Sequence, residues 1–207
     1  MIKPAARSCQ WTATRTWAAR HWTIRGGREL SLSGTLASMA NGLPYAIAMQ
    51  HGFPGRQVIA YVGDGGFSML MAEFLTPVQQ DLPVKVIIIN NNSLGQILWE
   101  QMVLGHPEHS VRYAAPEADF SAWARSCGGF GAKVNESGDV AGAIARALTH
   151  DGPALVDVDV NPNEPPMAGK VSYDQAKSFA QAFLKGQPHK ASIATTLFKD
   201  RIQKLGD

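Results

Sequence analysis

The stretch that decides the fold runs from Val58 to Gly95 and reads VIAYVGDGGFSMLMAEFLTPVQQDLPVKVIIINNNSLG. It contains two short apolar runs, Val58–Val62 and Val84–Ile89, whose length and β-branched residues are typical of buried parallel strands. The segment between them, Phe67–Gln80, is long enough for a helix. We therefore expect one strand–turn–helix–strand unit of a parallel sheet.

Glycine and polar residues cluster where each of these strands should end. The sequence GDGG, from Gly63 to Gly66, follows the first run, and NNN, from Asn90 to Asn92, follows the second. Ligands of open parallel sheets bind at the carboxyl ends of the strands. Carboxylate and amide oxygens suit a hard cation such as Mg²⁺, while glycines and a helix start let backbone N–H groups approach a phosphate.

Each cluster alone has a simpler interpretation, because a Gly-Asp-Gly after a strand is usually a tight turn and an asparagine run is usually a loop. Two nucleotide-binding motifs are excluded: Ser68 stands where G-x-G-x-x-G needs its third glycine, and G-x-x-x-x-G-K-[ST] does not occur. The specific feature is the combination, in which Asn91 follows Asp64 by 27 positions with a helix and a strand expected between them.

This combination resembles the diphosphate-binding motif of thiamine-diphosphate (ThDP) enzymes, a GDG followed by an NN pair. From about Thr12 to Leu184 the chain resembles the C-terminal, diphosphate-binding (PP) domain of the pyruvate oxidase and acetolactate synthase group. Bacterial pyruvate oxidase and pyruvate:quinone dehydrogenase-like proteins are the most similar members. Besides the central motif, the resemblance lies in TWAAR from Thr16, SMANGLPYAIA from Ser38 and NPNEPPMAGK from Asn161.

The alternation of expected strands and helices and the resemblance predict the same architecture. It is an α/β fold, a doubly wound, mainly parallel sheet with helices on both faces. We expect an irregular, basic lead-in over residues 1–11, the PP domain over residues 12–186 and a C-terminal tail over residues 187–207. The tail could form an amphipathic helix that lies on an anionic membrane, or it could fold back on the protein.

Several residues predict local features. Asp119 should cap a helix that ends at Gly128, and Ser172 should begin another through a capping box. Asp157 and Asp159 alternate with valines in the last expected strand. This alternation indicates either a strand near the sheet edge or carboxylates that face the site.

The resemblance implies roles for the matching positions. Asp64 and Asn91 would bind Mg²⁺ through their side chains, and Ser93 through its backbone carbonyl. The diphosphate would be lined by Gly63, Gly65, Gly66, Asn92, Leu94 and Gly95. The aminopyrimidine ring would contact Ala37, Ser38 and Met39. The last of these matches the bulky residue under the cofactor, although without the motif it would be taken for an ordinary core methionine.

The resemblance also implies the chemistry. ThDP supplies an ylid that adds to a 2-oxo acid and acts as an electron sink. Family members carry a separate pyrimidine-binding domain, whose glutamate promotes ylid formation, and a central domain that holds FAD in the oxidases. No glutamate here matches that role, so no catalytic residue is assigned. We expect an incomplete enzyme, the Mg-diphosphate-binding part of a pyruvate-type decarboxylase, oxidase or acetolactate-synthase-like enzyme that does not itself bind FAD.

Two other interpretations stay open, namely one subunit of a split ThDP-dependent decarboxylase and a non-catalytic binding module. In the parent enzyme the partners would be a 2-oxo acid such as pyruvate, the pyrimidine domain of another chain, and further copies of the same chain. Such partners would cover an apolar face around the site. The candidates for that face are Met39, Leu43, Met69, Leu70, Leu94, Ile97, Leu98 and Trp99.

Composition bounds the remaining possibilities. The chain has 207 residues with 45% hydrophobic content, which suits one large globular domain, and its net charge of +2 favours no nucleic-acid partner. Two distant cysteines, Cys9 and Cys127, indicate a reducing compartment, and we expect a cytoplasmic protein. No apolar run approaches the roughly 18 residues of a membrane span.

Overall fold

The computed structural model describes residues 7–11, 29–32, 35–36, 38–113, 118–164 and 173–206. It divides into two compact units. The sheet unit takes its described residues from Met1–Asn91 and Pro116–Val160, and the helical unit takes its residues from Asn92–Ala115 and Asn161–Asp207. Each unit is described by itself.

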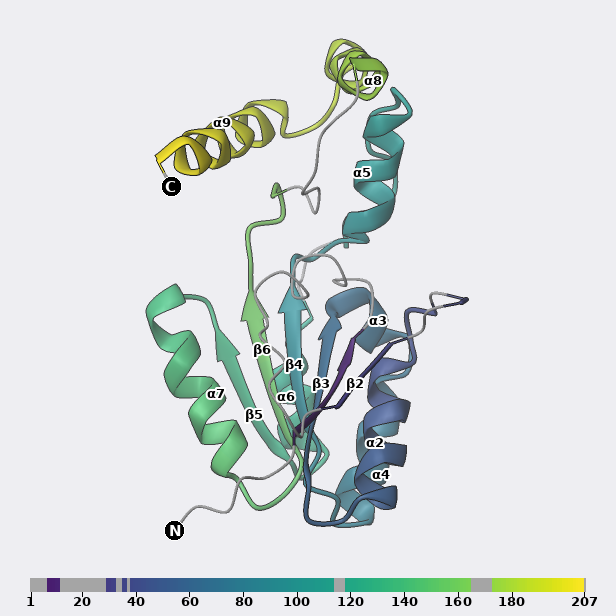
Figure 1. The fold of residues 1–207 in the computed structure, drawn as a ribbon, viewed down its shortest axis with the longest axis vertical. Coiled ribbons are helices and arrows are strands. Elements are labelled where there is room, and N and C mark those ends of the chain that lie inside the picture. Colours follow the sequence, from purple (N-terminus) through teal and green to yellow (C-terminus); the bar gives the residue numbers. More distant parts are fainter. Residues whose placement is uncertain are drawn as a thin grey trace. The chain divides into compact units, whose positions relative to one another are not determined.

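The sheet unit is built on parallel strands in the order β2-β1-β3-β4-β6-β5 (Figure 1). The neighbouring strands described all pair in parallel. The two runs of the central stretch form β3 and β4, which confirms both predicted strands. The strand bounds are β1 Arg7–Trp11, β2 Glu29–Leu32, β3 Gln57–Gly63, β4 Lys85–Asn90, β5 Phe130–Val134 and β6 Ala154–Asp159.

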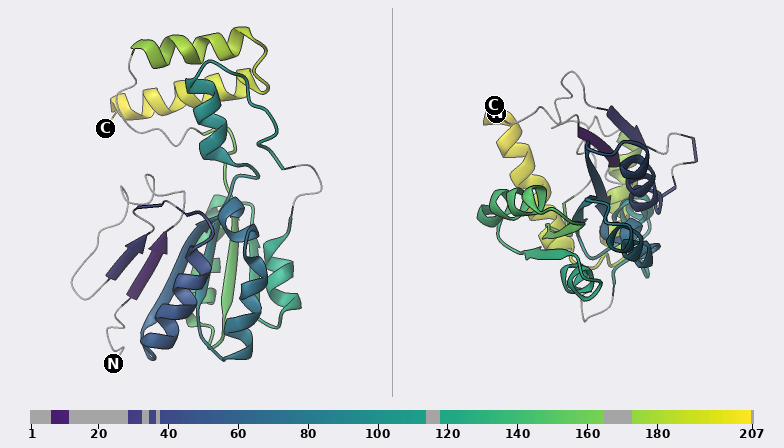
Figure 2. Two further views of the ribbon diagram at one scale, coloured as in Figure 1. Left: turned by 90° about the vertical axis from the view of Figure 1, so that its right-hand side faces the viewer. Right: turned by 90° about the horizontal axis from the view of Figure 1, so that it is seen from below.

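Helices cover both faces of this sheet, as predicted, with α7 on the side opposite α2 and α4 (Figures 1 and 2). Successive side chains of a strand point to opposite faces of the sheet, so apolar strands such as these supply a core to the helices on both sides. In β3, Val58 and Val62 pack into one apolar cluster and Ile59 packs into another on the opposite face. The bounds are α2 Gly42–Gly52, α3 Asp64–Ser68, the 3₁₀ helix η1 Met71–Phe74, α4 Leu75–Gln79, α6 Phe120–Ser126, the 3₁₀ helix η2 Ser137–Asp139 and α7 Val140–Thr149.

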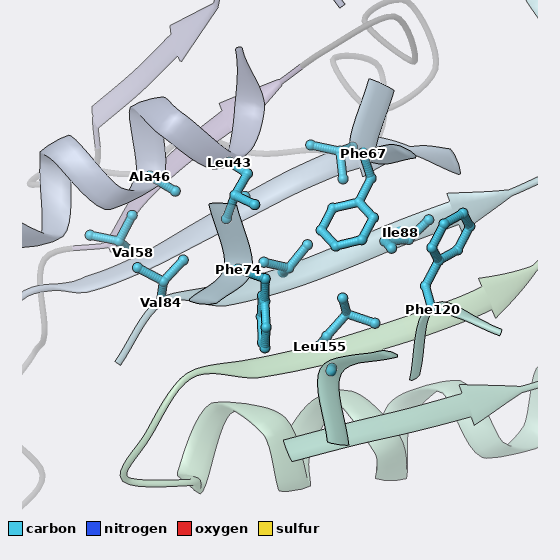
Figure 3. Packing of buried hydrophobic residues seen from close by; sticks show 13 residues of the cluster. Leu43, Ala46, Val58, Phe67, Phe74, Val84, Ile88, Phe120 and Leu155 are labelled. Atoms are coloured by element: carbon cyan, nitrogen blue, oxygen red, sulfur yellow. The ribbon is translucent and has the colours of Figure 1, made fainter. Parts of the chain in front are cut away.

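The largest cluster lies on the face covered by α2, α3 and α6. Figure 3 shows Phe67 and Phe120 over the strands beside Ile88. The two phenyl rings meet edge to face, with 5.4 Å between their centroids. This cluster anchors α3, the helix that begins at Asp64 within GDGG, to the carboxyl end of the sheet.

The prediction of a single helix over Phe67–Gln80 is wrong, because the chain forms three short helices, α3, η1 and α4, in this region. The break falls at Leu70, whose φ of −136° is not helical. Pro77 then lies in the first turn of α4, where its missing N–H costs no helical hydrogen bond.

Two local predictions are confirmed at α6. Asp119 caps it, since its Oδ1 accepts a hydrogen bond from the backbone N–H of Ala122 at 2.9 Å. Gly128 follows the end of the helix with a φ of +94°, a conformation that glycine adopts without strain. Burial and hydrogen bonds have opposite effects on the Asp119 carboxyl, and the bonds from Ser121 and Ala122 leave its pKa below the usual value.

The lead-in differs from its expectation. Residues 1–11 were expected to be irregular, yet Arg7–Trp11 form β1 and pair with both β2 and β3. The strand RSCQW has only two apolar residues, Cys9 and Trp11, which are too few for the sequence pattern to predict it. The predicted Ser172 capping box lies outside the described residues.

The helical unit consists of α5 Gly95–Val103, α8 Tyr173–Leu184 and α9 Lys190–Gly206, which share one apolar cluster (Figure 2). Trp99 of α5 stacks on Phe179 of α8 with 6.0 Å between ring centroids and an interplanar angle of 8°. Ile193 of α9 is fully buried in this cluster, and Leu197 packs against it. The tail therefore forms the predicted helix, and its Ile193 and Leu197 pack within the unit, whereas Phe198 is 69% exposed. No helix in the described part of the chain is long and apolar enough to cross a membrane.

Candidate functional site

The candidate site begins at the carboxyl ends of β3 and β4. Gly63 and Ile89 are register partners in these two parallel strands. Asp64 follows directly as the first residue of α3 and is only 3% exposed, and Asn90 is the last residue of β4 and is 6% exposed. The sheet thus brings the beginnings of the GDG and NN motifs to the same edge, as the sequence predicts.

The glycines of the motif add no side chains of their own to this edge. Gly63 has an extended conformation, with φ −84° and ψ 161°, and Gly65 and Gly66 continue into α3 and are buried. The hydroxyl of Ser68 donates to the carbonyl oxygen of Gly65 at 3.0 Å. The backbone can therefore turn sharply from strand to helix with the Asp64 carboxylate at the turn.

The second motif continues from one unit into the other. Asn91 is the last residue of the first segment of the sheet unit, and Asn92, Ser93, Leu94 and Gly95 belong to the helical unit. Asn92 has a φ of +51°, the left-handed conformation that asparagine tolerates better than most residues. The predicted metal and diphosphate residues are thus divided between the two units.

Within the helical unit, the segment 92–94 is held by the loop of residues 111–113. Leu94 donates its N–H to the Val111 carbonyl at 2.8 Å, and Tyr113 donates its N–H to the Asn92 carbonyl at 3.1 Å. Ser93, which is 3% exposed, forms an antiparallel bridge with Arg112. The backbone of the predicted Ser93 ligand is therefore fixed on both sides.

That loop is itself tied to the turn between α8 and α9. The guanidinium of Arg112 donates to both carboxylate oxygens of Glu108, at 2.8 and 3.0 Å. Gln187, which is 3% exposed, accepts from the Glu108 N–H at 2.8 Å and donates to the Glu108 carboxylate at 2.9 Å. Sequence patterns gave no signal for this network, because Glu108 and Gln187 are 79 residues apart.

The residues predicted for the aminopyrimidine lie before α2. Ala37 lies outside the described residues, Ser38 is exposed and Met39 is partly buried. Asn41, which sequence reasoning missed, directly precedes α2 and is 8% exposed. Among the described residues, its side-chain Oδ1 and Nδ2 have no hydrogen-bond partner. A buried amide of this kind fits a place where a polar ligand or partner completes the structure.

A second feature, which the alternating aspartates indicated only in part, is a buried polar network across three strand ends. Asp157 of β6 is fully buried, and its carboxylate accepts hydrogen bonds from the Asn90 amide and from Lys133 of β5. Lys133 also donates to Asp159. The alternating aspartates were a usable signal, and Asp157 proves to face Asn90, the first residue of the NNN run. Nothing in the sequence pointed to Lys133.

The donor set fits a magnesium ion better than a softer metal. No group of three or more His, Cys, Asp or Glu side chains able to hold a metal occurs within the described ranges. The donors predicted from the motif are instead one carboxylate, one amide oxygen and one carbonyl oxygen. Mg²⁺ usually binds only a few such hard oxygen ligands of a protein, and phosphate oxygens and water complete its octahedral coordination.

The apolar face predicted around the site is confirmed only in part. Among its candidates, Met69, Leu70 and Ile97 are 53%, 40% and 40% exposed. The prediction is wrong for Leu43, Leu98 and Trp99, which are 2%, 0% and 3% exposed. These three side chains pack into the apolar clusters of their own units, an outcome that depends on contacts distant in sequence.

The sequence of the chain is similar to those of known proteins. Residues 11–158 match the family described as "Thiamine pyrophosphate enzyme, C-terminal TPP binding domain". The chain is 43% identical over 189 residues, 91% of its own length, to "Putative thiamine pyrophosphate-containing protein YdaP" of Bacillus subtilis. It is 32% identical over 167 residues, 79% of its length, to "Acetolactate synthase catalytic subunit, mitochondrial" of Saccharomyces cerevisiae. These matches span 32% and 24% of the two relatives, so the chain covers a third or less of their length.

Proposed function

Because the chain belongs to the thiamine pyrophosphate enzymes, as their C-terminal TPP-binding domain, we propose that it holds the diphosphate of ThDP through a Mg²⁺ ion. Asp64 and Asn91 supply side-chain oxygens to the ion, and Ser93 supplies its backbone carbonyl. The observation that carries the proposal is the register of β3 and β4, which brings the starts of the GDG and NN motifs to one edge of the sheet.

Electrostatics explains why a cation is needed. A diphosphate carries several negative charges, and the nearly buried Asp64 adds another. Such a cluster is tolerable in a cleft only with a divalent cation among the charges. In this proposal the diphosphate oxygens are lined by Gly63, Gly65, Gly66, Asn92, Leu94 and Gly95.

The other end of the cofactor meets the segment before α2. Ala37, Ser38 and Met39 contact the aminopyrimidine ring, and Met39 supports it from below. The described neighbour Asn41 supports a polar interaction at this end, because its buried amide has no hydrogen-bond partner among the described residues.

The proposal extends to the parent enzyme. Bound ThDP supplies an ylid and an electron sink for the decarboxylation of a 2-oxo acid. Pyruvate is the favoured substrate class, because relatives include acetolactate synthases and the motif segments resemble those of the pyruvate oxidase group. The activating glutamate comes from a pyrimidine domain, which another chain of a homo-oligomer supplies. The present chain alone binds the cofactor and does not turn over substrate, and any FAD binds elsewhere in the parent.

The test is calorimetric titration of the 207-residue chain with ThDP in the presence and absence of Mg²⁺. We expect Mg²⁺-dependent binding that Asp64→Ala and Asn91→Ala weaken by at least tenfold. Asp139→Ala removes an exposed carboxylate at the start of α7 and serves as the matched control. Equal binding by Asp64→Ala and the unaltered chain would reject the proposal.

A further inference from the structure

The polar network at the ends of β4, β5 and β6 joins the candidate site to a buried charge. The side-chain Nδ2 of Asn90 donates to Oδ1 of Asp157 at 3.0 Å, and Nζ of Lys133 donates to Oδ2 of Asp157 at 3.0 Å. Each carboxylate oxygen therefore has its own donor. Asp157 is 0% exposed, and the side chain of Lys133 is 24% exposed.

Strand register explains how these residues meet. Asp157 pairs with Ile88 of β4 on one side and with Lys133 of β5 on the other. Asn90 lies two residues after Ile88, so its side chain points to the same face of the sheet. That face is the one covered by α3 and α6, because Ile88 and Leu155 pack there with Phe67 and Phe120 (Figure 3).

A buried carboxylate in this position is costly to maintain. Burial raises the pKa of Asp157, and the hydrogen bonds from Asn90 and Lys133 oppose that rise. Burial by itself would lower the pKa of Lys133, but the bonds to Asp159 and Asp157 outweigh it and leave that pKa above its usual value. A buried ion pair of this kind is weak evidence of stabilisation, since apolar residues of similar volume often serve as well. Its position beside the candidate site therefore calls for an explanation other than stability.

The backbone of Asn90 is held at the same place. Its carbonyl accepts a hydrogen bond from the N–H of Val160 at 2.8 Å, just beyond the end of β6. Asn90 is thus fixed to β6 through its side chain and its backbone. The next residue in the chain is Asn91, the proposed Mg²⁺ ligand in the same unit.

We propose that Lys133 and Asp157 are a positioning pair that fixes Asn90, and through it the Asn91 amide, for binding of the Mg-diphosphate. The inference rests on the proposed function. Lys133 neutralises Asp157 and orients its carboxylate, and Asp157 holds the Asn90 amide. Pre-positioning of this kind matters because Mg²⁺ demands near-ideal octahedral geometry. Neither residue needs to touch the ion.

Two double variants separate positioning from stability. Lys133→Met with Asp157→Val removes both charges and leaves the Asn90 amide without its acceptor. Lys133→Met with Asp157→Asn also removes both charges, but the introduced amide oxygen can still accept from Asn90. Asp159→Ala is the matched control, because it takes one carboxylate from Lys133 and leaves the bond between Asn90 and Asp157 intact.

The experiment titrates the full-length variants with inorganic diphosphate in the presence of Mg²⁺ and measures their thermal midpoints without ligand. We expect the variant with Asp157→Val to bind at least tenfold more weakly while its midpoint is maintained. The variant with Asp157→Asn and the control should bind within about threefold of the unaltered chain, a rescue that a purely structural role would not produce.

Three results would overturn the inference. The first is unaltered affinity in the variant with Asp157→Val. The second is equal weakening of both double variants, which would show that charge and not the hydrogen bond is responsible. The third is weakening only in proportion to a lowered midpoint. Because Asp64→Ala is titrated in parallel, the two proposals are separable: equal binding by Asp64→Ala and the unaltered chain rejects the proposed function itself, and the positioning role with it.

Discussion

Gly63 and Ile89 are register partners at the carboxyl ends of neighbouring parallel strands, so the chain leaves β3 and β4 at the same edge of the sheet. Asp64 begins its helix from the first strand and Asn90 ends the second. Asp64 and Asn91, 27 positions apart in the sequence, therefore follow the ends of two strands that are neighbours in the sheet.

Mg²⁺ and diphosphate together should stabilise the folded chain. A ligand that binds only the folded state at 100 times its dissociation constant adds about 2.7 kcal/mol to the free energy of unfolding. We expect the thermal midpoint to rise when both are present and to return to its ligand-free value when EDTA removes the metal. The Asp64→Ala variant should show no such rise, and a rise equal to that of the unaltered chain would contradict the assignment of Asp64.

Gly131 should not tolerate a side chain. A Cβ at this position would stand 2.0 Å from the Ser121 carbonyl oxygen, a backbone atom of α6 that cannot simply turn away. Gly131→Ala should therefore destabilise the protein by about 3 kcal/mol or more, measured by denaturant unfolding. Gly138→Ala is the control, because nothing lies within 4 Å of its Cβ position, and it should change stability by less than about 1 kcal/mol. Similar losses in the two variants would contradict the close packing of α6 on β5.

The tail should depend on Ile193 for its order. This side chain is 0% exposed in the cluster of α5, α8 and α9, whereas Phe198, also on α9, is 69% exposed. Ile193→Ala should cost the helical unit about 3 kcal/mol, and Phe198→Ala much less. Hydrogen exchange of the α9 amides is the suitable measurement, because the two units need not unfold together. Equal protection in both variants would show that α9 is not packed as described.

Because of Lys85, we expect the protein to become more stable as the pH rises through the alkaline range. Its Nζ donates to the carbonyl oxygens of His150 and Gly152, both at 2.5 Å, and the residue is 3% exposed. Burial lowers the pKa of Lys85 from 10.5 to about 8, although the Asp151 carboxylate nearby opposes the change.

The sign of the pH dependence follows from linkage. Between about pH 8 and 10.5 the unfolded chain holds the Lys85 proton more often than the folded chain does, so the free energy of unfolding rises with pH. The rise amounts to at most about 3.5 kcal/mol, since each pKa unit corresponds to about 1.4 kcal/mol. Denaturant unfolding of the unaltered chain and of Lys85→Met over this range measures it as a difference. A difference that stays constant with pH would contradict the lowered pKa.

The sequence by itself determined the elements whose signals are local. Continuous β-branched runs predicted β3 and β4, because strands buried on both faces need apolar residues at every position. Asp119 and Gly128 predicted the ends of α6, since a cap depends only on residues a few positions away. The GDG and NN motifs indicated the ligand class and the edge of the sheet at which to look.

Only the tertiary structure decided which side chains meet. Asn90 and Asp157 are 67 residues apart, and Lys133 reaches the same carboxylate from a third strand, so their contact depends on strand order and register. The same holds for Leu43 and Trp99, whose burial no local pattern reveals. The motif also gave no indication that the chain passes from one compact unit to the other directly after Asn91. Periodicity fixes which face a residue presents, whereas the partner on that face is set by loop closure and packing between segments far apart in the sequence.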